Sequence, residues 1–407
     1  MQIALMQLAR SARLVCVVPV LLLWVHVGLH WEYTSVDAST EACHARTLTE
    51  GGGLALQPGA TRGMGVHGVL CVLALAAFQL MGLPLLLGAK LLGALLAGVA
   101  LLLVPGAVAR LDGRRQVEGW DRLPCWIMAL HPALALHAAA GLGTSLTLLL
   151  VVLALRLSGR WLSSVPAALL ILTTLDALPL LAGLWIGRLV HSLRRDRGGF
   201  VDDLLWLLIP LASLLVFVLG CYLLFADPWP GVLSARQALL ETRLGSPQAL
   251  AQGWTQLGSW SATWGLTFPL GLLALAGAAC GAGGPRSSAE RSAQDLTVRR
   301  GGLEAAALGL CILAVVAASG GDVEGHRLVP LWLCLSLLWS SGLKWMVRRL
   351  PRAMPRVGLV AAGALCVGLA AGPCAAAIRT ALNPPPSPHQ QEMRLVRRLE
   401  TMITELG

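Results

Sequence analysis

Charged residues are scarce in this sequence, and lysine is almost missing from it. Of the 407 residues 13% are charged, and Lys90 and Lys344 are the only lysines, so arginine carries most of the positive charge behind the formal net charge of +10. Hydrophobic residues, by contrast, make up 56% of the chain. A water-soluble domain of this length has too little interior to hide so many apolar side chains. The composition therefore excludes a soluble globular protein and favours one that lies in a membrane.

The sequence also lacks the cysteine and histidine spacings that are typical of metal sites and disulfide frameworks. The ten cysteines form no CxxC pair and show no Cys/His spacing typical of zinc sites. Most of them lie inside apolar stretches and are interpreted as small core residues, namely Cys71, Cys125, Cys221, Cys311, Cys334 and Cys366. We expect no cofactor and no metal cluster, although Asp37 and Glu41 could supply oxygen ligands to a divalent cation.

Apolar stretches long enough to cross a bilayer recur along the whole chain. About 20 residues of helix span the hydrocarbon core, and helices satisfy their own backbone groups there. The sequence predicts an all-α polytopic membrane protein of about eleven transmembrane helices in a domain over 1–378, followed by a short tail over 379–407. The predicted spans are 13–30, 65–80, 85–109, 123–139, 142–157, 163–187, 203–226, 264–283, 304–319, 328–343 and 357–378. Pro84 separates the second from the third, and Gly141 and Gly143 mark a break after the fourth.

The distribution of arginine orients the predicted spans. With the N-terminus in the cytoplasm, the arginine-rich loops 188–202, 284–303 and 344–356 fall inside, as the positive-inside rule requires. Loop 110–122 disagrees, since it falls outside with four arginines among three acidic residues. The long first loop over 31–64 then lies outside, as do two later loops over 227–263 and 320–327 and the tail. We expect a multi-pass inner (plasma) membrane protein whose active face is periplasmic.

The first outside loop carries the acidic residues with the clearest chemical use. Asp37 follows the first span directly, and Glu41 lies one helical turn further on, so both share a face if a juxtamembrane helix begins there. A partly shielded carboxylate in that position can act as a general base on a hydroxyl group. The alternative is that Asp37 caps the helix by accepting hydrogen bonds from free backbone N–H groups.

This loop resembles the first periplasmic loop of the GT-C membrane glycosyltransferases, above all the bacterial arabinofuranosyltransferase-like and mannosyltransferase-like members. In that family the loop reads D-D-A-Y, then R-Y-A, then L-x-x-G-x-G-L-V-x-N-P-G. Asp37-Ala38 matches the second Asp and the Ala of the first motif. The remaining matches follow in register at Ala45, Leu48, Gly51, Gly53-Leu54 and Pro58-Gly59.

Four further segments resemble family motifs in the same order along the chain. Residues 140–144 (Ala-Gly-Leu-Gly-Thr) correspond to S-G-L-E-T, and 173–176 (Thr-Thr-Leu-Asp) to T-R-P-D-G or T-R-P-E-G. Residues 227–236 resemble G-D-x-x-P-N-T-x-x-A-K. Residues 320–330 resemble G-G-D-x-x-x-x-R-F-L-x-P, with Asp322 and Arg327 at its charged positions. The resemblance covers roughly residues 30 to 335.

The resemblance implies that the chain moves a sugar from a polyprenyl-phosphate donor to a glycan or protein acceptor outside the cytoplasm, with no nucleic-acid partner. Asp37 would then be the catalytic base, and Arg327 and Arg236 would hold the lipid phosphate through their guanidinium forks. The residues predicted to bind substrate are Glu41, Asp176, Arg236, Asp322, His326 and Arg327. Two simpler interpretations stay open: an interfacial salt bridge between Asp322 and Arg327, and a neutral, hydrogen-bonded Asp176 between helices.

Four polar motif positions are altered, which keeps a second hypothesis open. Val36 replaces the first Asp, Ser39 the Tyr, Gly143 the Glu of S-G-L-E-T, and Thr174 the Arg of T-R-P-D. These losses favour a catalytically inactive GT-C-like protein that serves as a membrane scaffold or lipid-binding partner. A transporter is disfavoured, because the chain shows no pseudo-repeated halves with interrupted helices.

Overall fold

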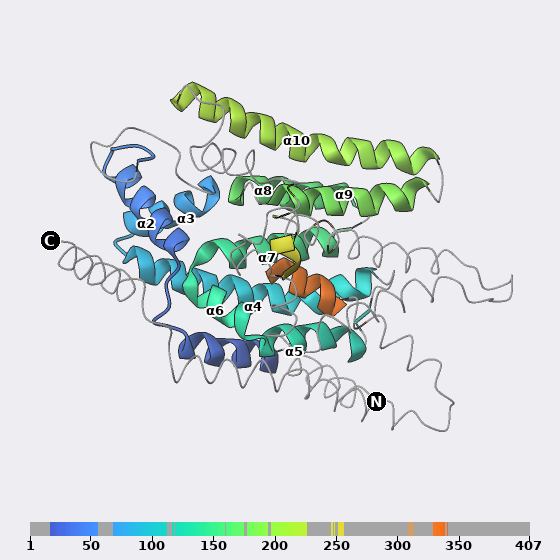
Figure 1. Ribbon diagram of the computed structural model, residues 1–407, viewed down its shortest axis with the longest axis horizontal. Helices are drawn as coiled ribbons and strands as arrows, with labels where there is room; N and C mark the ends of the chain where they lie inside the picture. The colour runs from blue at the N-terminus through green and yellow to red at the C-terminus, as the bar shows by residue number, and fades with distance from the viewer. Residues whose placement is uncertain are drawn as a thin grey trace, which may run out of the picture.

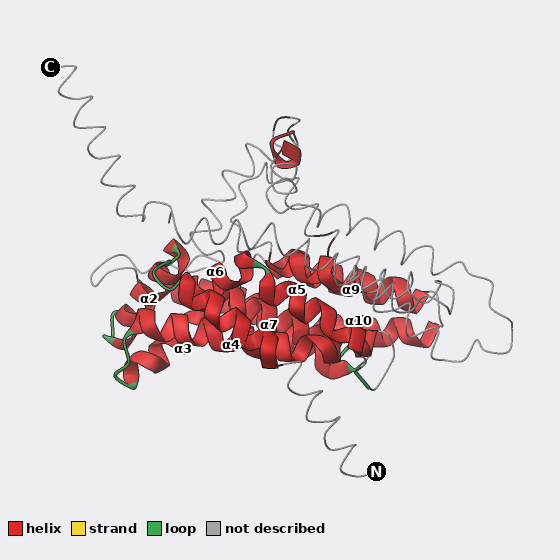
Figure 2. Ribbon diagram, turned by 90° about the horizontal axis from the view of Figure 1, so that it is seen from below, coloured by secondary structure: helices red, strands yellow, loops and turns green. Residues whose placement is uncertain are grey.

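The computed structural model describes residues 17–55, 68–111, 116–117, 119–158, 160–174, 177–193, 197–225, 246, 248, 251–255, 309, 311, 329–337 and 340. All regular structure among these residues is helical (Figure 2). The tail over 379–407 and the predicted spans 264–283 and 357–378 lie outside the described residues, and the spans 304–319 and 328–343 fall within them only in part.

The described elements are helices, several of which are joined by short turns. An apolar first helix covers Val17–Leu29. The labelled elements are α2 (Val36–Thr49), α3 (Val69–Leu80), α4 (Leu85–Leu111), η1 (Gly119–Arg122), α5 (Leu123–Leu130), α6 (Pro132–Ala140), α7 (Leu142–Arg156), η2 (Trp161–Ser163), α8 (Ser164–Thr173), α9 (Leu178–Leu193) and α10 (Arg197–Phe225). Residues 251–255 and 329–337 are also helical.

Helix α4 is the axis of the described structure. It lies between the first helix and α5 on one side and the α8–α10 group on the other, with α7 alongside it (Figure 1). The first helix is tied to α4 by Trp24 Nε1, which donates to the Ala94 carbonyl at 3.0 Å. A Cβ atom at Gly98 would lie 3.1 Å from the same indole nitrogen, so a small residue there lets the helices approach.

The closest approach in the core is between α4 and the turn that joins α6 to α7. A Cβ atom placed on Gly93 would lie 2.5 Å from the carbonyl oxygens of Ala138 and Gly141. No side chain fits there, so the backbones pack directly on one another. Small residues at helix interfaces allow this kind of contact in membrane proteins, where van der Waals packing replaces the hydrophobic effect as a source of association.

The predicted helix boundaries at Pro84 and Gly141 are confirmed. Helix α3 ends at Leu80 before Pro84, and α6 ends at Ala140 before Gly141, whose φ of +152° favours glycine. The span 123–139 is not one straight helix, however: α5 and α6 meet at 66°. The cause is Pro132, which lacks an N–H and forces His131 into an extended conformation (φ −79°, ψ 117°).

The prediction of one span over 163–187 also needs correction. The described residues there form two helices, since α8 ends at Thr173 and α9 begins at Leu178. Thr173 Oγ1 donates back to the Leu169 carbonyl at 2.8 Å, and Thr174 is extended. Back-bonding by a β-branched hydroxyl residue weakens the regular helical ladder and bends helices, which accounts for a break at two consecutive threonines.

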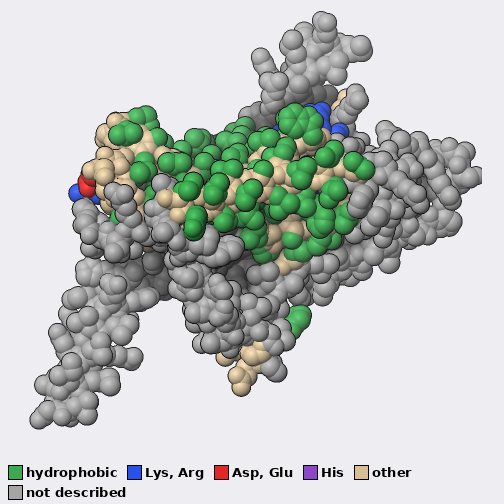
Figure 3. Space-filling view, turned by 90° about the horizontal axis from the view of Figure 1, so that it is seen from above, with side chains coloured by type: hydrophobic (Ala, Val, Ile, Leu, Met, Phe, Trp, Pro, Cys, Tyr) green, Lys and Arg blue, Asp and Glu red, His purple; other side chains and the backbone are tan. Residues whose placement is uncertain are grey.

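Two described helices are long and apolar enough to cross a membrane. They are Leu85–Leu111 and Leu204–Leu223, and α5 with α6 would add a third if the bent pair is one span. Helix α10 leaves large aliphatic side chains exposed, such as Leu215 (67%) and Leu223 (72%). Figure 3 looks onto this side and shows a broad hydrophobic face. Such a face is stable against lipid rather than water, so the chain is a helical membrane protein, while the number of eleven spans stays a prediction.

A matched pair of glycine substitutions tests the close packing of α4. We expect Gly93→Ala to destabilise the protein by about 1–3 kcal/mol, because the added methyl group collides with two backbone carbonyl groups. Gly220→Ala in α10 is the control, since a Cβ atom there meets nothing within 4 Å. It should leave the thermal unfolding midpoint in detergent unchanged or raise it. Equal midpoints for the two variants would contradict the packing described.

Candidate functional site

The predicted juxtamembrane helix is present as α2, and its N-terminus places Asp37. Ser35 is the N-cap, and its hydroxyl oxygen accepts a hydrogen bond from the Ala38 backbone N–H at 3.1 Å. The interpretation of Asp37 as the cap is therefore wrong. Asp37 is half-buried in the first turn of α2, where the helix dipole favours a negative charge.

Helix α2 docks on the turn between α6 and α7 through backbone contact. The Ser35 N–H donates to the Ala140 carbonyl at 3.4 Å. A Cβ atom on Gly141 would lie 2.6 Å from Ala38 Cβ, so the absence of a side chain at Gly141 lets α2 sit there. The first two segments that resemble family motifs, at Asp37-Ala38 and at 140–144, are thus brought together although they lie about a hundred residues apart in sequence.

Glu41 points from α2 into the interior between α3 and α7. Its side chain is buried, with 6% of the residue exposed. A Cβ atom on Gly143 would lie 3.4 Å from Glu41 Oε1 and 3.9 Å from Cys71 Sγ, so the carboxyl group and the thiol both lie beside position 143. Gly143 is the position at which the family motif has Glu. The structure therefore does place a carboxyl group beside position 143, but α2 supplies it instead of α7.

The environment of Glu41 changes its charge. Burial and, to a smaller extent, the nearby negative charge of Asp37 raise the pKa of Glu41 to about 8, although a hydrogen bond from the Cys71 thiol acts in the opposite direction. At neutral pH the Glu41 carboxyl is mostly protonated. Two carboxyl groups one turn apart thus have different environments, one buried and one half-buried, and such a difference lets one hold a proton while the other accepts one.

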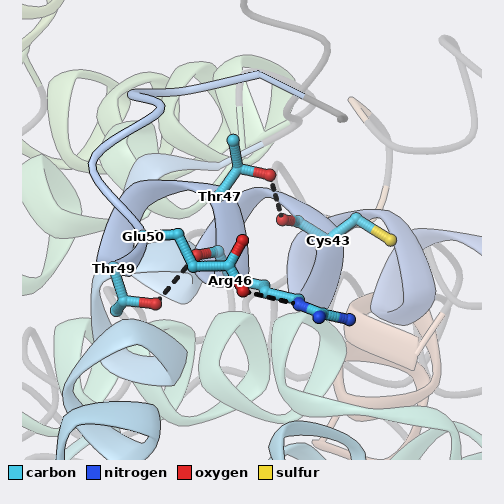
Figure 4. A network of polar contacts seen from close by, with 5 residues as sticks. All are labelled: Cys43, Arg46, Thr47, Thr49 and Glu50. Atoms are coloured by element: carbon cyan, nitrogen blue, oxygen red, sulfur yellow. Dashed lines mark hydrogen bonds and ion pairs between the residues drawn. The ribbon is translucent and has the colours of Figure 1, made fainter. Parts of the chain in front are cut away.

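The opposite, exposed flank of α2 has a structural role. Arg46 Nε and Glu50 Oε1 form an ion pair at 2.8 Å, and Thr49 Oγ1 donates to the Arg46 carbonyl at 2.8 Å (Figure 4). Thr47, which is buried at the edge of this flank, donates from its Oγ1 to the Cys43 carbonyl at 3.0 Å. These polar groups satisfy one another close to the C-terminus of the helix. Glu41, by contrast, is buried on the other flank of α2.

A third motif-like segment reaches the same end of the structure. Thr173, the first residue of the T-R-P-D-like segment, has its carbonyl oxygen against Gly68, and a Cβ atom at Gly68 would overlap that oxygen. Gly68 is the N-cap of α3, the helix that carries Cys71 beside Glu41. Three of the five motif-like segments therefore converge around α2 and α3.

Five of the predicted site residues lie outside the described residues: Asp176, Arg236, Asp322, His326 and Arg327. Two residues that end the fifth motif-like segment, Val329 and Pro330, begin a helical stretch, and Trp332 in it stacks on His131 with ring centroids 4.2 Å apart. That stretch therefore packs at the bend between α5 and α6.

Lys90 was not predicted as a site residue, yet it lies next to the first loop. Its Nζ donates a hydrogen bond to the Trp31 carbonyl and lies 5.6 Å from the centroid of the Trp31 ring. The contact joins the second turn of α4 to the segment that leads into α2. Within the described ranges, no three His, Cys, Asp or Glu side chains are grouped so that they could hold a metal ion.

The raised pKa of Glu41 predicts a pH effect on stability. The folded protein holds a proton on this group that the unfolded chain releases above its ordinary pKa of 4.5. The contribution of Glu41 to the free energy of unfolding is therefore fully present below about pH 4.5 and is lost as the pH rises through about 8. We expect the unfolding midpoint of Glu41→Gln to exceed that of the wild type by a margin that grows from pH 5 to pH 8. A margin independent of pH would show that Glu41 is not buried as described.

The comparisons with known proteins bear on the fold. No protein-family model matches the chain, and no curated protein matches it in sequence. The structure is similar to the crystal structure of ArnT from Cupriavidus metallidurans bound to undecaprenyl phosphate, with a TM-score of 0.51 and 14% sequence identity. The likeness covers 87% of this chain and 63% of the ArnT chain, so the protein spans less than two thirds of that length. At this identity the likeness shows the fold: the chain has an ArnT-like helical fold, which supports the GT-C-like fold class expected from the sequence.

Proposed function

We propose that this protein is a membrane glycosyltransferase that moves a sugar from a polyprenyl-phosphate donor to a glycan or protein acceptor on the periplasmic side of the inner membrane. The observation that carries the proposal is the convergence of the acidic flank of α2 with the turn at Ala140–Gly143. The GT-C fold supports it, and so does the undecaprenyl phosphate bound to ArnT. The finer likeness to arabinofuranosyltransferase-like and mannosyltransferase-like members rests on the motifs in the sequence.

In the proposed reaction Asp37 is the general base. Its carboxylate takes the proton of an acceptor hydroxyl while the hydroxyl oxygen forms a bond to the anomeric carbon of the sugar. The bond from that carbon to the phosphate oxygen breaks, and the polyprenyl phosphate leaves with the bonding electron pair. Asp37 suits this role because it is half-buried at a helix N-terminus, whereas the neutral Glu41 is suited to donate a hydrogen bond.

The remaining roles follow from the resemblance and stay proposals. Arg327 and Arg236 bind the lipid phosphate, Asp322 binds sugar hydroxyl groups or positions Arg327, and His326 and Asp176 contact the substrate. No cofactor is needed for this displacement. A divalent cation bound by Asp37 would compete with its role as base, and the protonated Glu41 is a poor second ligand for one.

The altered motif positions are the argument for an inactive scaffold instead. Gly143 and Thr174 lack the charged side chains of the family motifs. The position of Glu41 weakens this argument at one of the two places, because its carboxyl group lies beside position 143. A scaffold has no reason to keep a costly buried carboxyl group at that place. The enzyme is therefore the better supported function.

Loss of the base tests the proposal directly. In membranes supplied with a panel of labelled polyprenyl-phosphate sugars and acceptors, we expect the wild type to transfer sugar and Asp37→Asn to be at least about 100-fold slower, the usual contribution of a general base. Glu50→Gln is the matched control, since Glu50 lies on the exposed flank of the same helix. Absence of transfer by the wild type across the panel would support the scaffold, and an active Asp37→Asn would remove Asp37 as base.

Moving the carboxyl group from α2 to α7 tests the role of Glu41. Glu41→Ala should reduce transfer at least about 10-fold, as expected for loss of a buried hydrogen bond. The double variant Glu41→Ala/Gly143→Glu should recover part of the activity, because the space at Gly143 faces the vacated carboxyl position. A double variant no more active than Glu41→Ala would show that the carboxyl group at this place is not used.

A further inference from the structure

We propose that His44 and Glu41 together form an uncharged binding site for a sugar hydroxyl group on the inner flank of α2. The proposal rests on the glycosyltransferase function above and adds a binding residue to it. It starts from an anomaly in α2: a histidine that the fold covers completely and leaves without a hydrogen bond.

His44 is fully buried, with 0% of the residue exposed, and neither ring nitrogen has a hydrogen-bond partner within the described structure. A buried imidazole without a partner loses the hydrogen bonds it makes to water in the unfolded chain, at a cost of about 1–3 kcal/mol. A leucine at the same place would avoid that cost. Buried polar groups left in this condition in a native structure point to a role or to a partner that the free protein lacks.

The position of His44 connects it to the predicted site. Asp37, Glu41 and His44 follow the spacing i, i+4, i+7, which places them on one stripe along the helix. Neighbours three residues apart on a helix have Cβ atoms about 5–6 Å apart, so one small group can reach both His44 and Glu41. The exposed residues Ser39, Cys43 and Arg46 lie on the other side of α2.

The chemistry of the two side chains selects their ligand. Burial lowers the pKa of His44 and raises that of Glu41, so both are neutral at physiological pH. A neutral imidazole offers one donor and one acceptor, and a protonated carboxyl group offers the same. A hydroxyl group is also both donor and acceptor and therefore complements the pair without bringing a charge into a buried place. A phosphate or a carboxylate would be poorly matched here, so the ligand group is a hydroxyl of an uncharged sugar.

Two sugars could supply the hydroxyl group: the one on the donor lipid and one on the acceptor. Binding of separate probes by the full chain in lipid nanodiscs distinguishes them. The probes are a polyprenyl phosphate without sugar, the same lipid carrying an uncharged hexose, and a methyl glycoside as an acceptor mimic. The variants are His44→Leu, His44→Gln and, as a control on the exposed flank, Cys43→Ser.

We expect His44→Leu to unfold at the wild-type temperature or above it, because the change removes an unsatisfied polar group. It should bind the sugar-free lipid as the wild type does, and bind either the sugar-bearing lipid or the methyl glycoside about 10-fold more weakly, the value of one lost hydrogen bond. His44→Gln should recover part of that affinity, and Cys43→Ser should match the wild type.

Equal affinity of His44→Leu and the wild type for both sugar-bearing probes would overturn the proposal and leave a buried water as the partner of the imidazole. A lower unfolding temperature, with binding of all three probes reduced alike, would also overturn it by showing a structural role. If the wild type binds the sugar-free lipid but neither sugar, the hydroxyl site fails while the lipid partner stands. If the wild type binds none of the probes, the glycosyltransferase proposal fails with it.

Discussion

The turn at Gly141 meets both α4 and α2 at distances that leave no room for a side chain on Gly93 or Gly141. On one side of this turn α4 presents Gly93 to the carbonyl groups of Ala138 and Gly141, and on the other α2 places Ala38 where a side chain at Gly141 would be. Each approach is closer than any Cβ atom allows. In a membrane, where apolar surface alone does not drive helices together, such close van der Waals contact is a principal source of specific packing. The turn therefore links the start of the juxtamembrane helix to α4, in addition to the packing of α2 on α3 and α4.

Helix α2 packs chiefly on α3 and also on α4, and this packing decides which of its side chains face inward and hence what they can do. Glu41 is enclosed with Cys71 beside Gly143, while Asp37 stays half-buried at the start of the helix. Burial keeps the Glu41 carboxyl group mostly protonated at neutral pH, while Asp37 is only half-buried. His44 is also buried, and its ring nitrogens have no hydrogen-bond partner within the described structure. A polar flank that costs stability in this way is expected where function, rather than folding, selects the residues.

Local signals in the sequence were enough to predict the helices around the candidate site, but not the contacts between those helices. The acidic spacing predicted a juxtamembrane helix, and Pro84 and Gly141 predicted two boundaries, because each acts within a few residues of itself. The bend at His131–Pro132 had an equally local signal, a residue before proline, and could have been predicted. The N-cap could have been assigned to Ser35 for the same reason. The burial of Glu41 and the meeting of α2 with Gly141 could not, since they depend on side chains absent from residues about a hundred positions away.

We expect the inner flank of α2 to face the substrate while α2 is held on the α6–α7 turn. A structure determined by electron cryo-microscopy in lipid nanodiscs, with a non-reactive polyprenyl-phosphate sugar bound, would show both features at once. Density for the sugar should lie within hydrogen-bonding distance of Asp37 or of the Glu41–His44 pair, with Ala38 packed on Gly141. Sugar density elsewhere in the protein, or an α2 detached from Gly141, would disprove this arrangement.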